Sequence, residues 1–312
     1  MVTPPDVSLV TPELPVSVGT GPEREFTVKA RTQTQLIVRR FFAHKLAVGS
    51  LVVFVLILVV SLLGQRFWKY KYGVVNPDAL SEAPSWEHPL GTGDLGEDGL
   101  AQMLRGAQRS IQIALLVMVL QTAMATVVGA MSGYFRGWVD SGLMRLVDLL
   151  LTLPALALLI VLASRFNAGW VGVAFVIAFV GWAADSRVVR GVFLSLREKE
   201  YIEAARALGA KDRRIIVRHL LPNSLGVIIV NATLALAIAI LFEAALSYLG
   251  FGVQAPETSL GKLISDAQGA VDTRPWLFYF PGLVIIMIVL TVNFIGDGLR
   301  DAFDPTQTRV RA

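Results

Sequence analysis

Residues 46–64, LAVGSLVVFVLILVVSLLG, decide the fold, because no charged side chain interrupts them. A run of about 20 apolar residues is long enough to cross the hydrocarbon core of a bilayer as a helix. Basic residues stand on both sides of the run, at Lys45 and Arg66. The stretch therefore predicts a membrane-spanning helix and places the chain among integral membrane proteins.

The composition of the whole chain agrees with this class. Hydrophobic residues make up 54% of the 312 positions and charged residues 17%, against roughly 25% charged in soluble domains. The chain has no cysteine, which excludes disulfides, thiolate metal sites and cysteine nucleophiles. His44, His88 and His219 lie far apart, without the spacing of metal ligands. We therefore expect no metal or cofactor bound by this chain.

Five further apolar runs follow the first. We predict an all-α membrane protein whose spans lie at about 46–64, 110–131, 143–163, 170–184, 223–245 and 280–295. Pro154 predicts a kink in the third span. The membrane domain then covers 36–305, between a proline-rich tail at 1–35, predicted to be disordered, and a short tail at 306–312.

The basic residues indicate which segments face the cytoplasm. Six spans place both termini on one side, and with that side inside, 20 of the 28 Lys and Arg residues fall in cytoplasmic segments. The positive-inside rule favours this orientation. The net charge of +4 therefore reflects topology rather than a nucleic-acid surface. We expect cytoplasmic termini and no nucleic-acid partner.

The most charged of these segments is the loop at 185–222, which contains EKEYIEAARALGAKDRRIIVRHLLPN at 198–223. Acidic residues begin this sequence and basic residues end it, the order that a helix dipole favours. At helical spacing, one face of this helix has small side chains in its middle. It contains Tyr201, Ala204, Ala205, Leu208 and Gly209, and we call it the stripe. A second short helix is expected from Lys211, with Pro222 stopping it before the fifth span.

Two roles fit such a segment. An amphipathic helix can rest on lipid headgroups, but it then shows a larger apolar face with a lysine-rich border. Small residues instead let another protein approach the backbone closely. The stripe of alanine and glycine favours protein docking over lipid contact.

Acidic residues near the ends of the predicted spans are candidates for function, because a charge in a membrane is costly. Glu243, in the outer turn of the fifth span, is a candidate for the pathway or outer face, where it would meet an amino group of a peptide. Pairing with a partner subunit and exposure to outer water are its alternatives. Arg145 and Asp148 are expected to form a local ion pair. Asp185 and Asp297 fall at cytoplasmic ends, where solvation or pairing is expected.

The run Glu203-Ala204-Ala205, followed by Gly209 and by Leu221-Pro222, resembles the cytoplasmic EAA loop of bacterial ABC-importer permeases. In that family the loop forms a coupling helix in a groove of an ATPase subunit. The resemblance implies a six-helix type I importer fold. It also implies an ATPase-coupling site made of Glu203, Ala204, Ala205, Leu208, Gly209, Leu221 and Pro222.

Other segments narrow the resemblance. HPLGT at 88–92, GFGVQ at 250–254 and NFIGDGLRDAFDP at 293–305 are similar to the dipeptide/oligopeptide/nickel permease group. Over residues 35–305 the chain resembles its C-type subunit. The resemblance implies a second, B-type permease, two ATPase subunits, an extracytoplasmic substrate-binding protein and a place in the bacterial cytoplasmic membrane.

The chain itself has no glycine-rich phosphate loop followed by Lys and Ser or Thr. We therefore expect a non-catalytic subunit, with ATP and Mg²⁺ acting on the ATPase partners. The expected cargo is di- or oligopeptides, with nickel chelates or other small solutes as alternatives. An ion-coupled secondary transporter is the alternative of another class. It predicts carboxylates in the middle of spans, whereas the acidic residues of this chain lie near the span ends. A membrane scaffold gives no reason for the docking helix.

Overall fold

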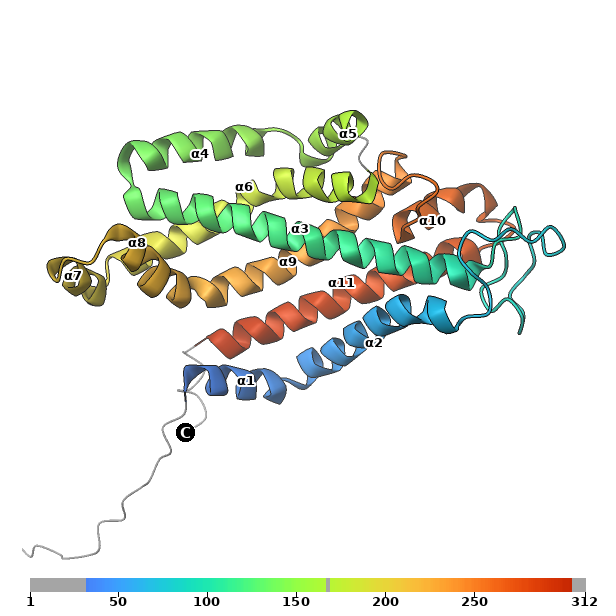
Figure 1. The fold of residues 1–312 in the computed structure, drawn as a ribbon, viewed down its shortest axis with the longest axis horizontal. Helices are drawn as coiled ribbons and strands as arrows, with labels where there is room; N and C mark the ends of the chain where they lie inside the picture. Colours follow the sequence, from blue (N-terminus) through green and yellow to red (C-terminus); the bar gives the residue numbers. More distant parts are fainter. Residues whose placement is uncertain (1–31, 167–168, 305–312) are drawn as a thin grey trace, which may run out of the picture.

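The computed structural model describes residues 32–166 and 169–304, so most of the tails predicted at 1–35 and 306–312 lies outside the described residues. Within these ranges the regular structure is helical, apart from one isolated bridge between Thr92 and Asp98. The helices form an elongated bundle (Figure 1). The predicted all-α membrane class is confirmed.

Helix α1 (Gln33–Ala43) begins inside the segment predicted as a tail. Its start is set by a capping box, in which the Thr32 and Gln35 side chains each accept from the backbone N–H of the other. Helix α2 (Lys45–Phe67) follows after His44, whose Nδ1 accepts from the amide of Ala47 at 3.1 Å. The uncharged run at 46–64 thus lies in one helix.

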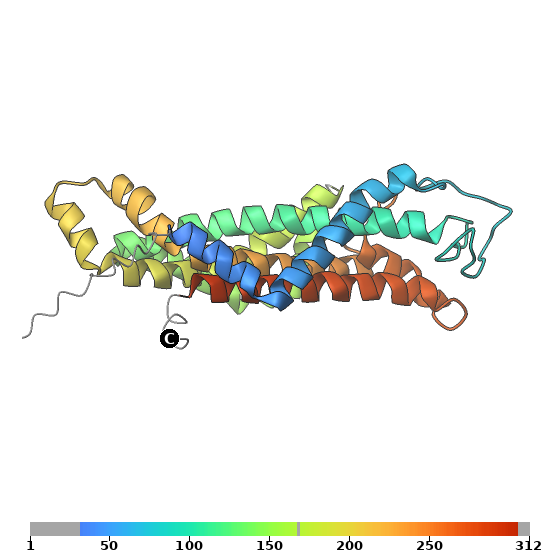
Figure 2. The ribbon, with the colours of Figure 1, turned by 90° about the horizontal axis from the view of Figure 1, so that it is seen from below.

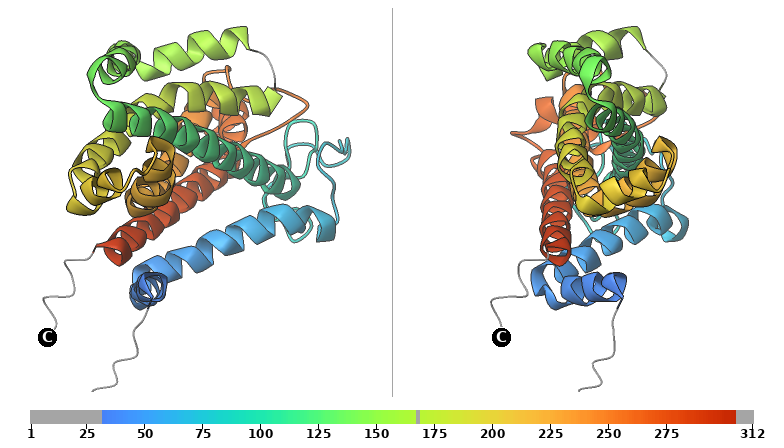
Figure 3. Two further views of the ribbon diagram at one scale, coloured as in Figure 1. Left: turned by 60° about the vertical axis from the view of Figure 1, so that its left-hand side comes forward. Right: turned by 90° about the vertical axis from the view of Figure 1, so that its left-hand side faces the viewer.

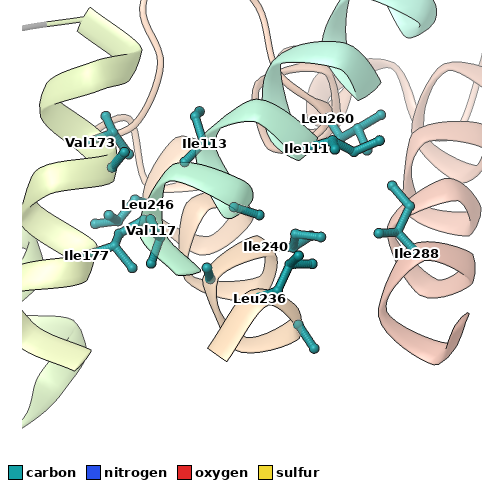
Figure 4. Packing of buried hydrophobic residues seen from close by; sticks show 14 of the residues in the cluster. Ile111, Ile113, Val117, Val173, Ile177, Leu236, Ile240, Leu246, Leu260 and Ile288 are labelled. Carbon is teal, nitrogen blue, oxygen red and sulfur yellow. The ribbon is translucent and has the colours of Figure 1, made fainter. Parts of the chain in front are cut away.

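Four longer helices make the body of the bundle: α3 (Gly99–Phe135), α6 (Gly169–Arg197), α9 (Leu221–Tyr248) and α11 (Trp276–Phe303). With α2, and with α9 extended back to Asp212, they are the five helices of the described residues that are long and apolar enough to cross a membrane. Their aliphatic side chains, among them Ile113, Ile177 and Ile240, meet in the core between α3, α6, α9 and α11 (Figure 4).

The third predicted span is two helices, α4 (Gly137–Thr152) and α5 (Ala155–Arg165), which meet at 91°. A sixth span exists only if this bent pair counts as one. Pro154 has no N–H to donate, and it disfavours the helical conformation at Leu153, whose φ and ψ are −84° and 138°. The expected kink is therefore a full break between two helices.

Short helices occupy the connections. They are α7 (Glu200–Ala207), α8 (Asp212–Ile215), a π-helical turn η1 (Ile216–Leu220), α10 (Leu260–Asp266) and a 3₁₀ turn η2 (Gln268–Ala270). Helix α8, the π turn and α9 run without interruption from Asp212 to Tyr248.

The prediction that Pro222 stops the second short helix is therefore wrong. A proline ring in an α-helix clashes with the carbonyl four residues back, and the wider π turn immediately before Pro222 relieves that crowding. The Asn223 side chain then donates to the carbonyl of His219 at 2.6 Å. Proline is also tolerated in the first turn of a helix, where Pro222 stands in α9.

The bundle has two distinct ends. Helices α7 and α8 project at one extreme, and the segment at 68–98 closes the other (Figure 2). Helices α4 and α5 lie along one side of α3 and α6, while α1 and α2 lie along the opposite side (Figure 3). We call the first extreme the α7 end and the second, with the segments 68–98 and 249–259 and helix α10, the α10 end.

Candidate functional site

The surface of α7 is the candidate site at the α7 end. Leu208 is 88% exposed and Tyr201 43%, and Glu203, Ala204 and Gly209 are exposed as well. Ala205 is half-buried. The stripe expected from helical spacing therefore faces outward and is small at its centre.

The opposite face of α7 fastens the helix to the bundle. Ile202 is fully buried in a cluster with Phe193 of α6, Ile215 of α8 and Ile228 of α9. The cluster also contains Tyr134 of α3. Burial of one such side chain stabilises the attachment by about 1.5–3 kcal/mol. Helix α7 thus has an anchored inner face and a free outer face.

Gly209 ends α7 rather than adding to its contact surface. Its φ is +78°, and the amides of Gly209 and Ala210 donate to the carbonyls of Arg206 and Ala205 at 2.9 and 3.0 Å. This is the Schellman pattern of a helix C-terminus, which favours glycine at the left-handed position. Any other side chain at position 209 strains the backbone, although space there is open.

The two remaining residues of the predicted coupling site lie apart from this stripe. Leu221 and Pro222 belong to the first turn of α9, where Leu221 packs against the cluster that holds Ile202 and Pro222 is exposed. The site thus divides into an outward stripe on α7 and an attachment at the start of α9.

One ion pair links the start of the α7 loop to the turn after α3. Arg136, between α3 and α4, pairs with Glu198 after α6. The hydrogen bond from the Arg136 guanidinium lowers the pKa of the Glu198 carboxyl. This pair leaves the small residues of the stripe uncovered.

Glu243 lies near the α10 end and is fully buried. Ser110 of α3 donates to its Oε2 at 2.8 Å, and Ser247 donates to its Oε1 at 2.7 Å. The Ser110 hydroxyl also accepts from the amide of Leu260 at 3.1 Å. The carboxyl thus joins α3, α9 and α10.

Glu243 is fully buried within this chain, and its pathway role stays a prediction. The serines that hold it were missed from the sequence. Ser247 stands four residues after Glu243, which is the spacing of neighbours on one helix face and a usable signal. Ser110 had no local signal, because it comes from another helix.

Three other acids bind side chains of neighbouring helices, and one of them has a partner other than the one expected. Asp148 of α4 pairs with Arg187 of α6 rather than with Arg145. Asp185 accepts from Nε2 of Gln121 on α3 at 2.8 Å. Asp140, which the sequence did not single out, receives two hydrogen bonds from Arg190, both at 2.6 Å. These contacts tie α4 and α3 to α6.

The α10 end is also built from fixed polar contacts. His88 Nδ1 lies 2.8 Å from Oδ2 of Asp98, and the indole of Trp68 donates to Oδ1 of the same carboxylate at 2.8 Å. Asp98 also caps α3 by accepting from the amide of Ala101 at 2.7 Å. His88 therefore orders the segment before α3.

A cavity of about 480 Å³ opens at this end between the segment 68–98, α10 and the start of α11. Its lining includes Glu97, Glu257, Asp266, Arg274 and Trp276. Burial raises the pKa of Glu97, and the neighbouring carboxylates of Asp266 and Asp94 raise it further. The end opposite α7 is thus hollowed and carries charges of both signs.

Comparisons with known proteins agree with this architecture. Residues 125–309 match the family model described as "Binding-protein-dependent transport system inner membrane component". Residues 32–84 match the "N-terminal TM domain of oligopeptide transport permease C". Between the two matched ranges, residues 85–124 are left out, and these include most of α3.

Several curated relatives are similar over most of their length. The oligopeptide transport system permease protein OppC of Mycobacterium tuberculosis is 44% identical over 278 residues, 88% of this chain and 96% of the relative. A putative peptide permease protein of Brucella suis is 40% identical, covering 85% and 89%. The dipeptide transport system permease protein DppC of Alkalihalophilus pseudofirmus is 38% identical, covering 84% and 86%.

A solved structure shares the fold. An inward-facing structure of the MetNI methionine ABC transporter matches with a TM-score of 0.56 and 19% identity, covering 65% of this chain and 96% of the other. At that identity the likeness concerns the fold alone.

Proposed function

Because this chain belongs to the family of binding-protein-dependent transport system inner membrane components and is a permease subunit of an ABC importer, we propose that its α7 surface binds an ATPase subunit and that its cargo is di- or oligopeptides. The two halves of the proposal rest on different observations. The first concerns the α7 end, and the second concerns the relatives.

The exposed stripe of α7 carries the docking half. Leu208 is almost fully exposed beside small residues, while Ile202 on the other face is fully buried. Small side chains beside Leu208, on a short helix that is anchored from behind, would let a partner protein approach the helix backbone closely. A partner that closes over Ala204 and Leu208 would bury them without reshaping the bundle.

The relatives support peptides as the cargo. Their names specify oligopeptide, dipeptide or peptide transport, and they align with this chain over most of its length. The nickel alternative has no such support. An ion-coupled mechanism is also disfavoured, since the buried Glu243 is occupied by serine hydroxyls of its own chain.

The remaining parts of the proposed importer follow from the same role. This multi-pass permease would pair with a second, B-type permease, with two ATPase subunits and with an extracytoplasmic binding protein. ATP and Mg²⁺ would act on the ATPases, and this chain would have no catalytic step of its own. Its termini and α7 would face the cytoplasm, with the α10 end toward the binding protein.

Ala204→Arg tests the docking half of the proposal. Ala204 is exposed and helical, so a larger side chain is accommodated in the free chain, whereas Gly209 cannot be replaced without backbone strain. We expect ATP-driven peptide uptake by the reconstituted complex to fall about tenfold or more, the effect of losing about 1.4 kcal/mol at an interface. Co-purification of the ATPase should weaken with it.

Ala83→Arg is the matched control, because Ala83 is exposed at the α10 end. It should leave ATPase binding unchanged. Assembly and uptake by Ala204→Arg at the wild-type level would refute the docking site. Uptake that continues without the ATPase subunits would refute the ATP-driven importer, and retention of nickel chelates but not peptides by the cognate binding protein would refute the cargo.

A further inference from the structure

Helix α3 is connected to the α7 end only through side chains. Helix α6 leads directly into the loop that holds α7, and α9 continues from α8 and the π turn. A displacement of α7 therefore reaches α6 and α9 through the backbone. Helix α3 packs along both of them but has no covalent continuity with the loop. Its direct contacts with α7 and α8 come from its own last turn.

Tyr134, in that last turn, makes the attachment. The side chain is only 4% exposed, and its hydroxyl donates to Oδ1 of Asp212 at 2.5 Å. Asp212 is the first residue of α8. Hydrogen bonds to a charged acceptor are about twice as strong as neutral ones. One end of the Tyr134 ring is thus tied to the start of the continuous helix that becomes α9.

Two guanidinium groups lie against the same ring. Arg197, the last residue of α6, is 5.6 Å from the ring centroid, and Arg206 of α7 is 5.5 Å from it. Both distances fall in the range of cation–π attraction. Arg197 also donates to the backbone carbonyl of Tyr134 at 2.5 Å. Tyr134 therefore contacts α6, α7 and α8.

The residues next to Tyr134 are packed so closely that the last turns of α3 have little room to deform. A Cβ on Gly133 would lie 2.7 Å from Cβ of Phe193 and 2.8 Å from the carbonyl of Arg190. A Cβ on Gly129 would lie 2.6 Å from the carbonyl of Ser186. The last turns of α3 thus lie in direct backbone contact with α6, so the tyrosine and its helix must move together.

We infer that Tyr134 is the positioning residue that makes α3 follow α7 when the ATPase moves it. The inference rests on the proposed docking of an ATPase at α7. Without the ring, Arg197 and Arg206 lose the surface that holds them together, and Asp212 loses its hydroxyl donor. Helix α3 would still follow α6, against which it packs, but its last turn would no longer be held to α7 and α8.

Tyr134→Phe and Tyr134→Leu, compared in the reconstituted importer, test this role. Phenylalanine keeps the ring and removes the bond to Asp212, whereas leucine removes both sets of contacts. We expect the number of peptides imported per ATP hydrolysed to fall about threefold with phenylalanine and at least tenfold with leucine. Assembly with the ATPase should stay at the wild-type level. Tyr279→Phe, at an exposed tyrosine near the start of α11, is the matched control and should change neither quantity.

A distance measurement separates positioning from a loss of stability. Because this chain has no cysteine, two introduced thiols, at Ala207 of α7 and at Met131 of α3, are its only labelling sites. In the wild type the distance between the two spin labels should stay the same when ATP is trapped. In Tyr134→Leu it should change, since α7 moves while the last turn of α3 is no longer held to it.

The inference is overturned if both Tyr134 variants import as many peptides per ATP as the wild type. If Ala204→Arg abolishes uptake while the Tyr134 variants are normal, the tyrosine role alone is lost. If Ala204→Arg is normal too, the docking proposal falls with it. If Tyr134→Leu fails to assemble, Tyr134→Phe decides the outcome, because it preserves the packing of the ring.

Discussion

At the scale of single residues, Glu257 fastens the loop between α9 and α10 to the rest of the molecule. Its carboxylate receives hydrogen bonds from Arg109 at 2.6 and 3.0 Å and from Arg105 at 3.1 and 3.2 Å. The Arg109 guanidinium also lies 4.7 Å from the centre of the Trp170 ring. Partial burial acts to raise the pKa of Glu257. The hydrogen bonds and positive charges of the two arginines act in the opposite direction and outweigh burial, so the net pKa lies below its usual value.

The lowered pKa of Glu257 determines how the stability of residues 249–259 depends on pH. A carboxyl whose pKa is lowered on folding contributes stability above its unfolded pKa, about 4.3, and that contribution is lost as the pH falls through the folded value. We therefore expect hydrogen exchange of residues 249–259, corrected for intrinsic rates, to be constant from about pH 5 to 8 and to quicken only at lower pH.

Glu257→Gln should have the same effect at neutral pH as acid has on the wild type. We expect hydrogen exchange of residues 249–259 to be roughly two- to fivefold faster than in the wild type, which corresponds to a loss of about 0.5–1 kcal/mol of local stability. Asp272→Asn is the control, because Asp272 is exposed at the same end and forms no ion pair among the described residues. Unchanged exchange in Glu257→Gln would show that the loop is held by its other contacts.

At the scale of elements, two ion pairs of unequal burial fasten α4 to α6. Arg190 grips both oxygens of Asp140 and is two-thirds buried, whereas Arg187 and Asp148 are each about half exposed. Val147 and Trp182 add apolar contact between the same helices. The buried pair should therefore supply most of the electrostatic attachment.

Arg190→Ala should destabilise the purified chain by about 1–3 kcal/mol, because Asp140 is left charged and without its main donor. Arg187→Ala, the matched change three residues earlier on α6, should cost only about 0–1 kcal/mol. Unfolding in mild detergent, monitored for both variants, measures the difference. Equal losses would mean that burial does not decide the value of these pairs.

The helices themselves were largely predictable from the sequence, and their ends were not. Hydropathy located the apolar middle of α3 at 110–131, but the helix begins at Gly99 and includes Arg105 and Arg109, which pair with Glu257. Pro154 predicted a kink but not its 91° angle, and α4 and α5 on its two sides both pack against α6. The α7 stripe followed from helical spacing, whereas Tyr134 and Asp212 are 78 positions apart and meet only in the fold.

At the scale of the whole molecule, the two ends of the bundle carry different segments, and this constrains the membrane topology. Helix α1, the end of α11 and α7 gather toward one end, and Arg40 of α1 donates to the carbonyl of Asp304 after α11 at 3.1 Å. The segment 68–98 and α10 lie at the opposite end (Figure 2). A membrane around the bundle must therefore separate α7 from the segment 68–98.

Single cysteines at Ala207 and at Ala83 test this separation in intact cells, because the chain has no cysteine of its own. Both positions are exposed. A membrane-impermeant maleimide should label position 83 from outside and reach position 207 only after the cells are opened. Labelling of position 207 in intact cells would reverse the orientation, and labelling of both would rule out a membrane between them.

The π turn before α9 carries a further consequence for the phase of the helix. Buried residues occur at 215, 220, 224 and 228, so a spacing of five at the turn is followed by spacings of four. In an α-helix a step of five turns a side chain by about 140° away from its predecessor, whereas a π turn, with its i→i+5 bonds, brings the two onto one side. Ile215 and Leu220 thus face the same cluster only because the turn is wide. Removing one residue here would give a uniform α-helical spacing of four, keep the buried side in line and shorten the link from α7 to α9 by about 1.5 Å. A deletion at this turn would therefore change the length of the connection from α7 to α9 without changing which side of it is buried.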